Sequence, residues 1–131
     1  MREILFRGKL TDNSKWVYGC LLDKIYGAVP VIMSEQSVDD AFNLEFEYDH
    51  VQEKTVGQYT GMKDKNGKRI FEGDICKVKN LLYKVEFIYS CWWFTILSSK
   101  VYCCPAFNSH CGEYCEIVGN IHDNPELLEN P

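Results

Sequence analysis

The chain has 131 residues, a net charge of −5 and an aromatic content of 14%. This length suits one domain with a smaller lobe attached, and it buries a core without the help of disulfides. The acidic balance disfavours a general nucleic-acid or membrane binder, which presents a basic surface, and no apolar run approaches the ~20 residues of a membrane span.

The first residues, "MREILFRGKL", lack the apolar core of a secretory leader, so we expect a soluble cytoplasmic protein. The cysteine count is odd, at seven, which favours reduced thiols over a disulfide framework. Cys20, Cys76 and Cys91 fall inside strand-like runs and are predicted to be buried thiols that pack as small apolar side chains.

The first predicted element is a β-hairpin over residues 3–22. Both arms alternate with period two, and the second arm carries Trp16, Tyr18, Cys20 and Leu22 in one phase. The polar sequence "TDNS" at 11–14 forms the turn, because such side chains bond to their own backbone. The alternation predicts that one face of the hairpin packs while the other is solvated.

The next 28 or so residues are less regular. A third strand is predicted at 27–33, and Pro30 places it at a sheet edge because proline cannot donate to a strand ladder. Residues 34–43 are acidic and weakly patterned and are interpreted as a loop. Residues 44–49 alternate apolar and acidic side chains, which predicts a strand.

The stretch "GQYTGMKDKNGKRIFEGDICKV", residues 57–78, is predicted to bend the chain rather than to carry chemistry. Its first turn ends at Gly67 in a left-handed conformation, and its second turn uses Gly73 for the bend and Asp74 as a hydrogen-bond acceptor. Two turns within about twenty residues suit a small, strongly bent barrel.

Two aromatic strands follow at 83–89 and 92–97. The second is apolar on both faces, so it is either buried on both sides or half of an interface. Trp92, Trp93 and Phe94 are therefore the interface candidates. A last strand near 115–123 bends at Gly119, and Asn124 with Pro125 predicts the start of a short terminal helix.

Three stretches give the chain a family resemblance. They are "REILFRGKLTDNSKWVYGCLL", "TVGQYTGMKDKNGKRIFEGDICKV" and "YCEIVGNIHDNPELL". With these motifs the chain resembles the YopX family of phage and prophage proteins. The resemblance implies a β-rich fold whose C-terminal part looks like an SH3-type barrel, in a phage-encoded protein that works inside a bacterial host. It implies no activity, because the family has no assigned one. The cysteines after Val101 depart from the family pattern.

The predicted fold is therefore all-β, with small bent sheets, a C-terminal SH3-like barrel and a short C-terminal helix. We expect a hairpin lobe over residues 1–55 and a barrel lobe over 56–131, within one YopX-like domain.

A metal site is the sharpest chemical alternative in the sequence. The cysteines and histidine after Val101 are zinc-ligand types, and Cys111 and Cys115 have a suitable spacing, whereas the side chains of adjacent cysteines diverge on a strand. We expect no metal and no cofactor. A site, if present, would contain Cys111 and Cys115, together with His110 or one of Cys103 and Cys104.

A basic segment at 63–79 supports an alternative nucleic-acid function. It carries six basic and three acidic residues, a net +3 that leaves −8 elsewhere. Its nucleic-acid candidates are Lys63, Lys65, Lys68 and Arg69, with the nearby rings of Tyr59 and Phe71 placed to stack bases. The simpler interpretation is a solvated hairpin whose charges keep a sheet edge from aggregating.

Catalysis is the weakest class. His50, His110 and His122 are scattered, and no nucleophile or phosphate-binding motif accompanies them. We expect a non-enzymatic binding module that contacts another protein or a second copy of itself. Nucleic-acid binding through residues 63–79 and modulation of a host defence or host factor are the alternatives.

Overall fold

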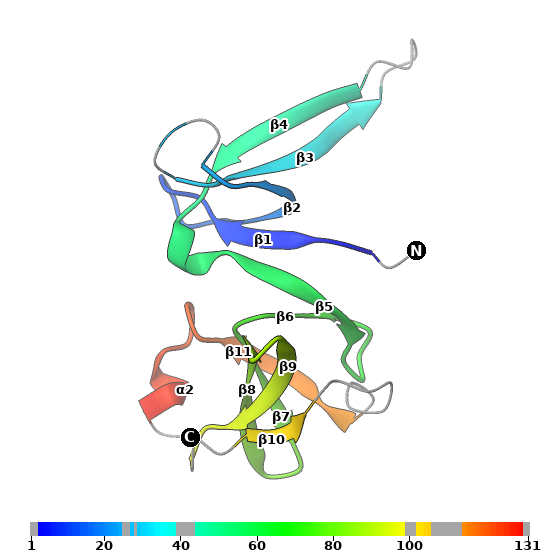
Figure 1. Ribbon diagram of the computed structural model, residues 1–131, viewed down its shortest axis with the longest axis vertical. Helices are drawn as coiled ribbons and strands as arrows, with labels where there is room; N and C mark the ends of the chain where they lie inside the picture. Colours follow the sequence, from blue (N-terminus) through cyan, green and yellow to red (C-terminus); the bar gives the residue numbers. More distant parts are fainter. Residues whose placement is uncertain are drawn as a thin grey trace. The chain divides into compact units, whose positions relative to one another are not determined.

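The computed structural model describes residues 3–24, 27, 29–38, 44–98, 102–105 and 114–129, with the backbone alone described at 35–38, 44–46 and 102–105. The described chain is mainly β-structure, as the alternating, aromatic-rich sequence predicts. It divides into two compact units, Met1–Gln58 and Tyr59–Pro131. Each unit contains antiparallel strands and buried apolar residues of its own (Figure 1).

The first unit is an antiparallel sheet in which hydrogen-bonded neighbours follow the order β4-β3-β2-β1-β5. Its elements are β1 (Phe6–Lys9), β2 (Trp16–Leu22), β3 (Val31–Val38), β4 (Leu44–His50), the 3-10 helix η1 (Glu53–Thr55) and the first two residues of β5 (Gly57–Lys63). The rest of β5 belongs to the second unit, where it pairs with β6 (Arg69–Phe71).

The β1–β2 hairpin confirms the first prediction. The amide of Leu10 donates to the carbonyl of Lys15 at 2.9 Å, and the amide of Lys15 donates to Asn13 Oδ1 at 3.0 Å. The Asn13 side chain thus takes up a backbone donor inside the turn, which explains why polar residues favour this conformation.

The apolar phase of β2 does not form a buried face. Tyr18 is 46% exposed, and Cys20 is exposed, so the prediction of a buried Cys20 thiol is wrong. Cys20 pairs with Met33, which pairs in turn with Tyr48. Tyr48 is itself 52% exposed, so the face that Cys20 shares with it is accessible to solvent.

The core of the first unit comes from β3 and the residue after β4. Val31, Ile32 and Val51 are completely buried. Two close backbone contacts surround them. A Cβ at Gly8 would lie 3.0 Å from the Cβ of Val51, and a Cβ at Gly19 would collide with the carbonyl of Met33. Glycine therefore allows β1 and β2 to approach their neighbours closely.

The region around β3 corrects two predictions. Pro30 precedes the strand, and its carbonyl accepts the amide of Val51 at 3.0 Å. β3 lies between β2 and β4 rather than at an edge, which the proline tolerates because the ladder begins one residue later. Residues 34–38 continue β3, so the loop expected over 34–43 is wrong for that part, while 39–43 lie outside the described residues. The strand expected at 44–49 is confirmed as β4.

The second unit contains a five-stranded antiparallel sheet in the order β10-β9-β8-β7-β11. Its elements are β6, β7 (Asp74–Val78), β8 (Leu81–Ile88), β9 (Cys91–Ile96), β10 (Tyr102–Pro105), β11 (Glu116–Asn120) and the short helix α2 (Glu126–Glu129). The predicted terminal helix and the irregularity at Gly119, where the β11–β7 register shifts, are both confirmed. No closed barrel is found among the described residues, so the SH3-like detail is not confirmed.

The core of the second unit is formed by residues that face one another from several strands. Its fully or nearly fully buried members are Ile70, Cys76, Val85, Phe94 and Cys115. Partly buried apolar side chains pack around them, among them Tyr83, whose ring meets that of Phe94 edge-on at 5.8 Å. The buried state predicted for Cys76 is confirmed.

The bends of residues 57–78 are confirmed. Gly67 has a φ of 80°, and its amide donates to the carbonyl of Asp64 at 3.0 Å, which closes the β5–β6 turn. Gly73 has a φ of 90° in the β6–β7 turn, where Asp74 Oδ2 accepts the amide of Phe71 at 2.8 Å. Both glycines adopt a conformation that strains other residues, so this stretch shapes the chain.

Candidate binding surface

The hairpin of β8 and β9 has an unusual tip. Ile88 pairs with Cys91, which leaves a two-residue turn of Tyr89 and Ser90. Both turn residues have a positive φ, 51° at Tyr89 and 63° at Ser90. Positive φ at both central positions is the signature of a type I′ turn, which suits the twist of the strands.

The residues in this turn do not match its conformation. Type I′ turns favour Asn-Gly, because most other residues are strained at positive φ. Tyrosine is large and has no short polar group that bonds back to its own backbone, yet Tyr89 occupies the first position and is 81% exposed. The turn therefore holds an aromatic ring in solvent at the expense of backbone strain.

Further aromatic side chains lie beside the turn. The ring of Phe87 meets that of Trp92 edge-on, with centroids 4.9 Å apart. Phe87 is 51% exposed, whereas Trp92 packs against the core of the second unit. Trp93 Nε1 donates to the carbonyl of Ile88 at 3.0 Å, which fixes the indole against the hairpin. We name Phe87, Tyr89, Trp92 and Trp93 the aromatic tip.

Polar contacts hold the face of the two strands that lies opposite Phe87 and Trp92, and Trp93, which pairs with Glu86, shares this face. Lys84 Nζ lies 2.7 Å from Glu86 Oε1, and Thr95 Oγ1 donates to Glu86 Oε2 at 2.7 Å. Glu86 on β8 thus contacts both its own strand and β9, and these contacts restrain the hairpin next to the aromatic tip.

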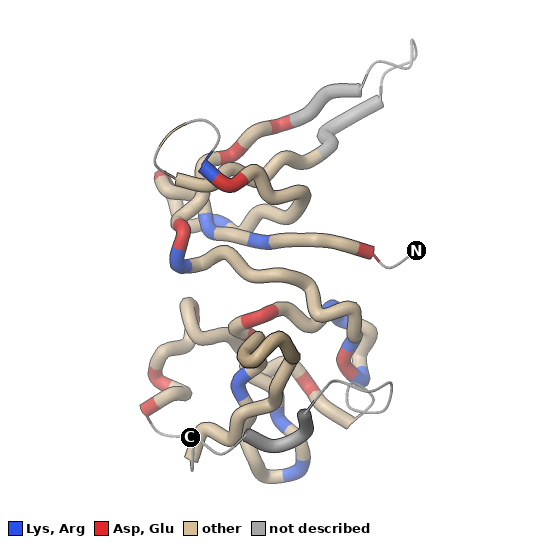
Figure 2. The backbone as a smooth tube through the Cα atoms, viewed as in Figure 1, with Lys and Arg blue, Asp and Glu red and all other residues tan. Residues whose placement is uncertain are grey.

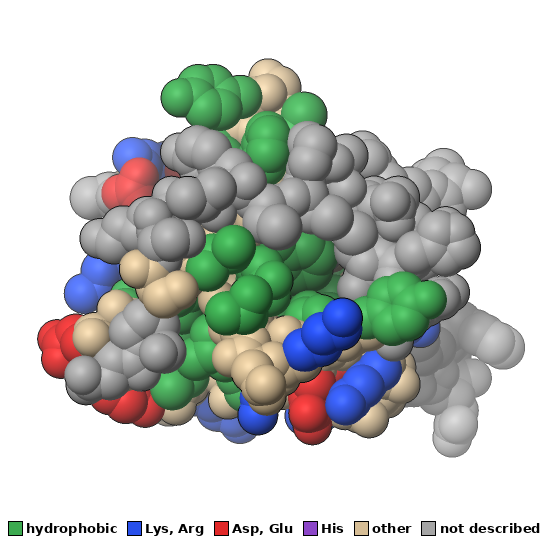
Figure 3. All heavy atoms as spheres, turned by 90° about the horizontal axis from the view of Figure 1, so that it is seen from below, with side chains coloured by type: hydrophobic (Ala, Val, Ile, Leu, Met, Phe, Trp, Pro, Cys, Tyr) green, Lys and Arg blue, Asp and Glu red, His purple; other side chains and the backbone are tan. Residues whose placement is uncertain are grey.

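In the space-filling view, hydrophobic side chains gather at the centre of one face with charged groups at its margin (Figure 3).

The structure separates the three predicted interface residues. Trp92 and Trp93 are half-buried, while Phe94 is only 4% exposed and lies in the hydrophobic core. Phe94 is therefore not available at the surface, because its ring packs inside the sheet. Phe87 and Tyr89 were expected within the strand over 83–89 and were not among the interface candidates. The gap between the two predicted strands places the turn at Ser90 and Cys91, one residue beyond the observed turn, so it does not identify Tyr89.

The β5–β6 turn carries the predicted nucleic-acid candidates. Lys63, Lys65, Lys68 and Arg69 are all exposed, and Figure 2 shows basic residues at this turn. We name these four residues the basic turn. Lys65 Nζ lies 3.5 Å from Glu116 Oε2, and the Arg69 guanidinium lies 5.7 Å from the centre of the Tyr59 ring.

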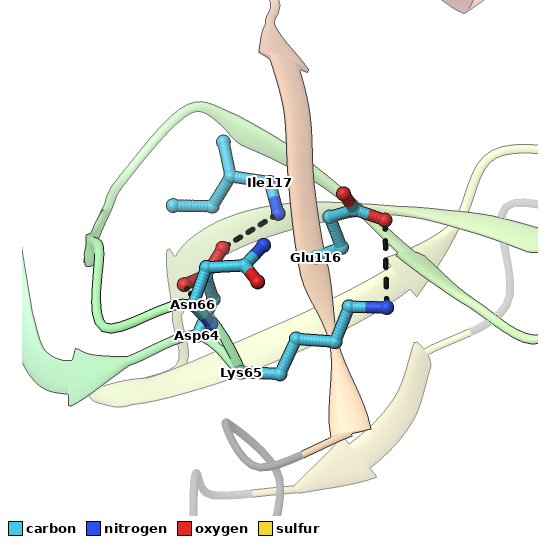
Figure 4. Close-up of polar contacts among 5 residues, drawn as sticks. All are labelled: Asp64, Lys65, Asn66, Glu116 and Ile117. Atoms are coloured by element: carbon cyan, nitrogen blue, oxygen red, sulfur yellow. Dashed lines mark hydrogen bonds and ion pairs between the residues drawn. The ribbon is translucent and has the colours of Figure 1, made fainter.

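Asp64 organises this turn from within. Its Oδ1 accepts the amides of Asn66 and Lys68, each at 2.9 Å. Its Oδ2 accepts the amide of Ile117 at 3.0 Å (Figure 4). Burial raises the pKa of this carboxyl, but the backbone donors outweigh burial and lower the pKa below its usual value. Because Lys65 also donates its amide to the carbonyl of Cys115, the turn is tied to β11.

The aromatic part of the nucleic-acid hypothesis is wrong at this turn. Tyr59 and Phe71 are 7% and 4% exposed, and their ring centroids lie 5.7 Å apart inside the second unit. Rings that pack against each other in the interior cannot stack on bases. The basic turn therefore offers contacts to phosphate alone.

The cysteines do not gather into a metal site among the residues that the structure describes. Cys76 and Cys115 are fully buried neighbours. A hydrogen bond to Cys115, together with burial, raises the pKa of the Cys76 thiol far above its usual value, so that it stays protonated. For Cys103 and Cys104 the backbone alone is described, and His110 and Cys111 lie outside the described residues. Cys91 is half-buried.

The described histidines lie in different units. His50 ends β4, and its carbonyl accepts the amide of Thr11 at 3.1 Å. His122 lies in the turn before α2, where its amide donates to Asn120 Oδ1 at 2.9 Å. In both cases the main-chain group of the histidine forms this hydrogen bond. In the described part of the chain, no helix has the length and apolar character needed to cross a membrane.

Comparison with known proteins gives a family and a fold. The family model described as YopX protein matches residues 5–129. One similar solved structure is "Crystal structure of protein EF1440 from Enterococcus faecalis", with a TM-score of 0.63 and 22% identity over 98% of this chain and 99% of that chain. At this identity the likeness concerns the fold alone. No curated protein matches the chain.

Proposed function

We propose that this chain, which belongs to the YopX family as its motifs predict, is a non-enzymatic binding module that uses the aromatic tip as its contact surface. The partner is another protein or a second copy of the chain. The phage setting that the family resemblance implies makes the bacterial cytoplasm the place of this contact.

The exposure and the backbone conformation of Tyr89 support this proposal most strongly. The residue is 81% exposed on a backbone with a φ of 51°. Strained conformations persist where the surrounding structure imposes them, and they concentrate at functional sites. Exposed, well-supported aromatic side chains are also the residues that contribute most to protein–protein binding.

The support around Tyr89 also favours binding. The two-residue turn fixes the direction in which the Tyr89 side chain leaves the backbone, and the edge-on contact of Phe87 with Trp92 holds the adjacent rings. Binding orders the side chains at an interface, and each ordered side chain costs about 0.5–1.5 kcal/mol. A surface that is already ordered avoids part of this cost.

The test compares Phe87→Ala and Tyr89→Ala with Tyr114→Ala in the full chain. Tyr114 is 67% exposed in the same unit and lies outside the aromatic tip, so it is a matched control. Light scattering over a range of concentrations detects self-association, and affinity capture from host cells detects a partner. We expect both tip variants to lose the contact and the control to keep it. Equal capture by all three variants would refute the proposal.

The basic turn supports a second candidate, binding of nucleic-acid phosphates. Its four cations are exposed, while the carboxylate of Asp64 faces inward to backbone donors. Affinity should then fall steeply with salt and vanish in Lys65→Glu with Lys68→Glu. Binding that is insensitive to both changes would eliminate this candidate.

Modulation of a host defence or host factor is the third candidate, and it rests on the phage setting alone. It too operates by binding, so the capture experiment includes it. Recovery of a defence protein by the wild type and by Tyr114→Ala, but not by Tyr89→Ala, would identify it.

A further inference from the structure

A second aromatic surface lies on the sheet of the first unit. Residues that pair across an antiparallel sheet project from the same face. Lys9 pairs with Trp16 and Arg7 pairs with Tyr18, so these four side chains share one face of β1 and β2. The chain of pairs from Cys20 through Met33 to Tyr48 extends this face across β3 to β4.

The rings on this face are accessible. Tyr18 is 46% exposed and Tyr48 is 52% exposed. Two strands, β2 and β4, present them from either side of β3, and Tyr18 lies two residues along β2 from Cys20, which is level with Tyr48. Their backbone positions are therefore roughly 12 Å apart, from two strand spacings across the sheet and two residues along it. We name Lys9, Trp16, Tyr18 and Tyr48 the tyrosine face.

Positive charge accompanies these rings. The Arg7 guanidinium lies 4.5 Å from the centre of the Trp16 ring, and Lys9 Nζ lies 5.5 Å from it. Arg7 is 6% exposed and holds the indole in place, whereas Lys9 is half-buried and is able to reach a ligand. The carboxylates of Glu47 and Asp49 project from the opposite face, because side chains alternate along β4.

We propose that the tyrosine face binds single-stranded nucleic acid, with bases stacked on Tyr18 and Tyr48 and a phosphate beside Lys9. Proteins that bind single strands combine aromatic rings, on which bases stack, with cations that contact the backbone. Here two accessible rings share one face with a cation, while Glu47 and Asp49 project from the opposite face, and this arrangement matches a strand in which bases alternate with phosphates.

This site differs from the basic turn in its expected salt dependence. For single strands, the logarithm of the binding constant falls with the logarithm of salt concentration by about 0.7 per phosphate neutralised. One or two cations on the tyrosine face predict a slope between about −0.7 and −1.4, and the four cations of the basic turn predict about −2.8. Stacking thus supplies most of the affinity on the tyrosine face.

The test uses the full-length protein and fluorescently labelled oligothymidine and oligouridine of about twelve nucleotides, within the range of known single-strand sites. Fluorescence anisotropy measures affinity across a salt series. Tyr18→Ala and Tyr48→Ala should each weaken binding by about 5- to 150-fold, the range expected for one stacked base. Tyr18→Phe keeps the ring and should bind as the wild type does, and Tyr114→Ala is the exposed-aromatic control.

Three outcomes would overturn the proposal. The first is no binding of either oligonucleotide by the wild type. The second is binding that survives Tyr18→Ala with Tyr48→Ala but is lost in Lys65→Glu with Lys68→Glu, with a steep salt slope, which would assign the site to the basic turn. The third is loss of a protein partner, rather than of the oligonucleotide, in the tyrosine variants. Because Tyr89 lies in the other unit, failure here leaves the aromatic tip untouched.

Discussion

Replacing the β8–β9 turn with its preferred sequence should separate stability from binding. The change is Tyr89→Asn together with Ser90→Gly, which places Asn-Gly in a turn whose φ angles are 51° and 63°. Asn tolerates the left-handed conformation and glycine adopts it without steric conflict. We expect the double variant to be more stable than the wild type and to lose the contact made by the aromatic tip.

The magnitude follows from the strain that is relieved. A left-handed conformation costs an ordinary residue about 1–2 kcal/mol. Two such residues are replaced, but glycine gives back about 0.5–1 kcal/mol because it gains more freedom in the unfolded chain. A net gain of about 1–3.5 kcal/mol remains, which raises the melting temperature by at least about 4 °C for a unit of this size.

The assay is thermal and urea unfolding of the double variant, followed by circular dichroism, beside the capture experiment on the same protein. Tyr89→Ala is the matched control, because it removes the ring while its turn position keeps a left-handed residue with a Cβ. A double variant that is less stable than the wild type would refute the strain argument. One that is stabilised and still captures the partner fully would refute the role of the ring.

Three further predictions concern the second unit and the thiols. Asp64→Asn should destabilise the fold by about 1.5–3 kcal/mol, because Nδ2 replaces an acceptor that faces a backbone donor. Because the pKa of Asp64 is lowered in the folded state, the carboxylate stabilises the fold above its unfolded pKa of about 3.9, and this stabilisation is lost as the pH falls through the folded pKa. Urea unfolding of the wild type and Asp64→Asn from pH 7 to pH 2 should therefore show their free energies of unfolding converging as the pH falls. A stability difference that does not change with pH would contradict the role given to Asp64. Phe94→Ala should lower the free energy of unfolding by about 3–5 kcal/mol, because Phe94 lies in the core. Phe87→Ala should lower it by about 0.5–1.5 kcal/mol, because it removes mainly the contact with Trp92. Denaturant unfolding measures both, and equal losses would mean that Phe94 is not a core residue. In the native protein, iodoacetamide should modify the exposed Cys20 at once and the buried Cys76 only after unfolding. Mass spectrometry of the peptides measures both rates, and labelling of Cys76 in the native protein would mean that it is not buried.

The turns of the second unit were the most predictable part of the fold. Gly67 and Gly73 lie where the backbone needs a positive φ. The side chains of Asp64 and Asp74 accept hydrogen bonds from backbone amides in the two turns. Such signals are local, because they depend on a few consecutive residues. They identified the bends without any knowledge of the sheet around them.

Features that depend on neighbouring strands were not predictable. Alternation shows that the two faces of β2 differ, but not which one is covered, and Cys20 proved exposed. Residues 34–38 are mostly polar and resemble a loop, yet they continue β3 and pair with β4, and pairing is decided by the rest of the sheet. Pro30 indicated an edge, although it needed only to precede the ladder.

The candidate site was only half visible in the sequence. The aromatic run of β9 indicated Trp92 and Trp93, but composition does not distinguish a ring in the core, such as Phe94, from one at the surface. Tyr89 was hidden because tyrosine is a poor residue for a type I′ turn. A sequence that contradicts its local geometry is informative only after the geometry is known.

Photo-crosslinking in cells decides whether the aromatic tip contacts a protein. A benzophenone amino acid is placed at Tyr89 or, as the control, at Tyr114, and the full chain is irradiated in bacterial cells. We expect a crosslinked partner or dimer from position 89, which excess wild-type chain suppresses and excess Tyr89→Ala chain does not. Crosslinks from position 114 alone, or equal suppression by both competitors, would contradict it.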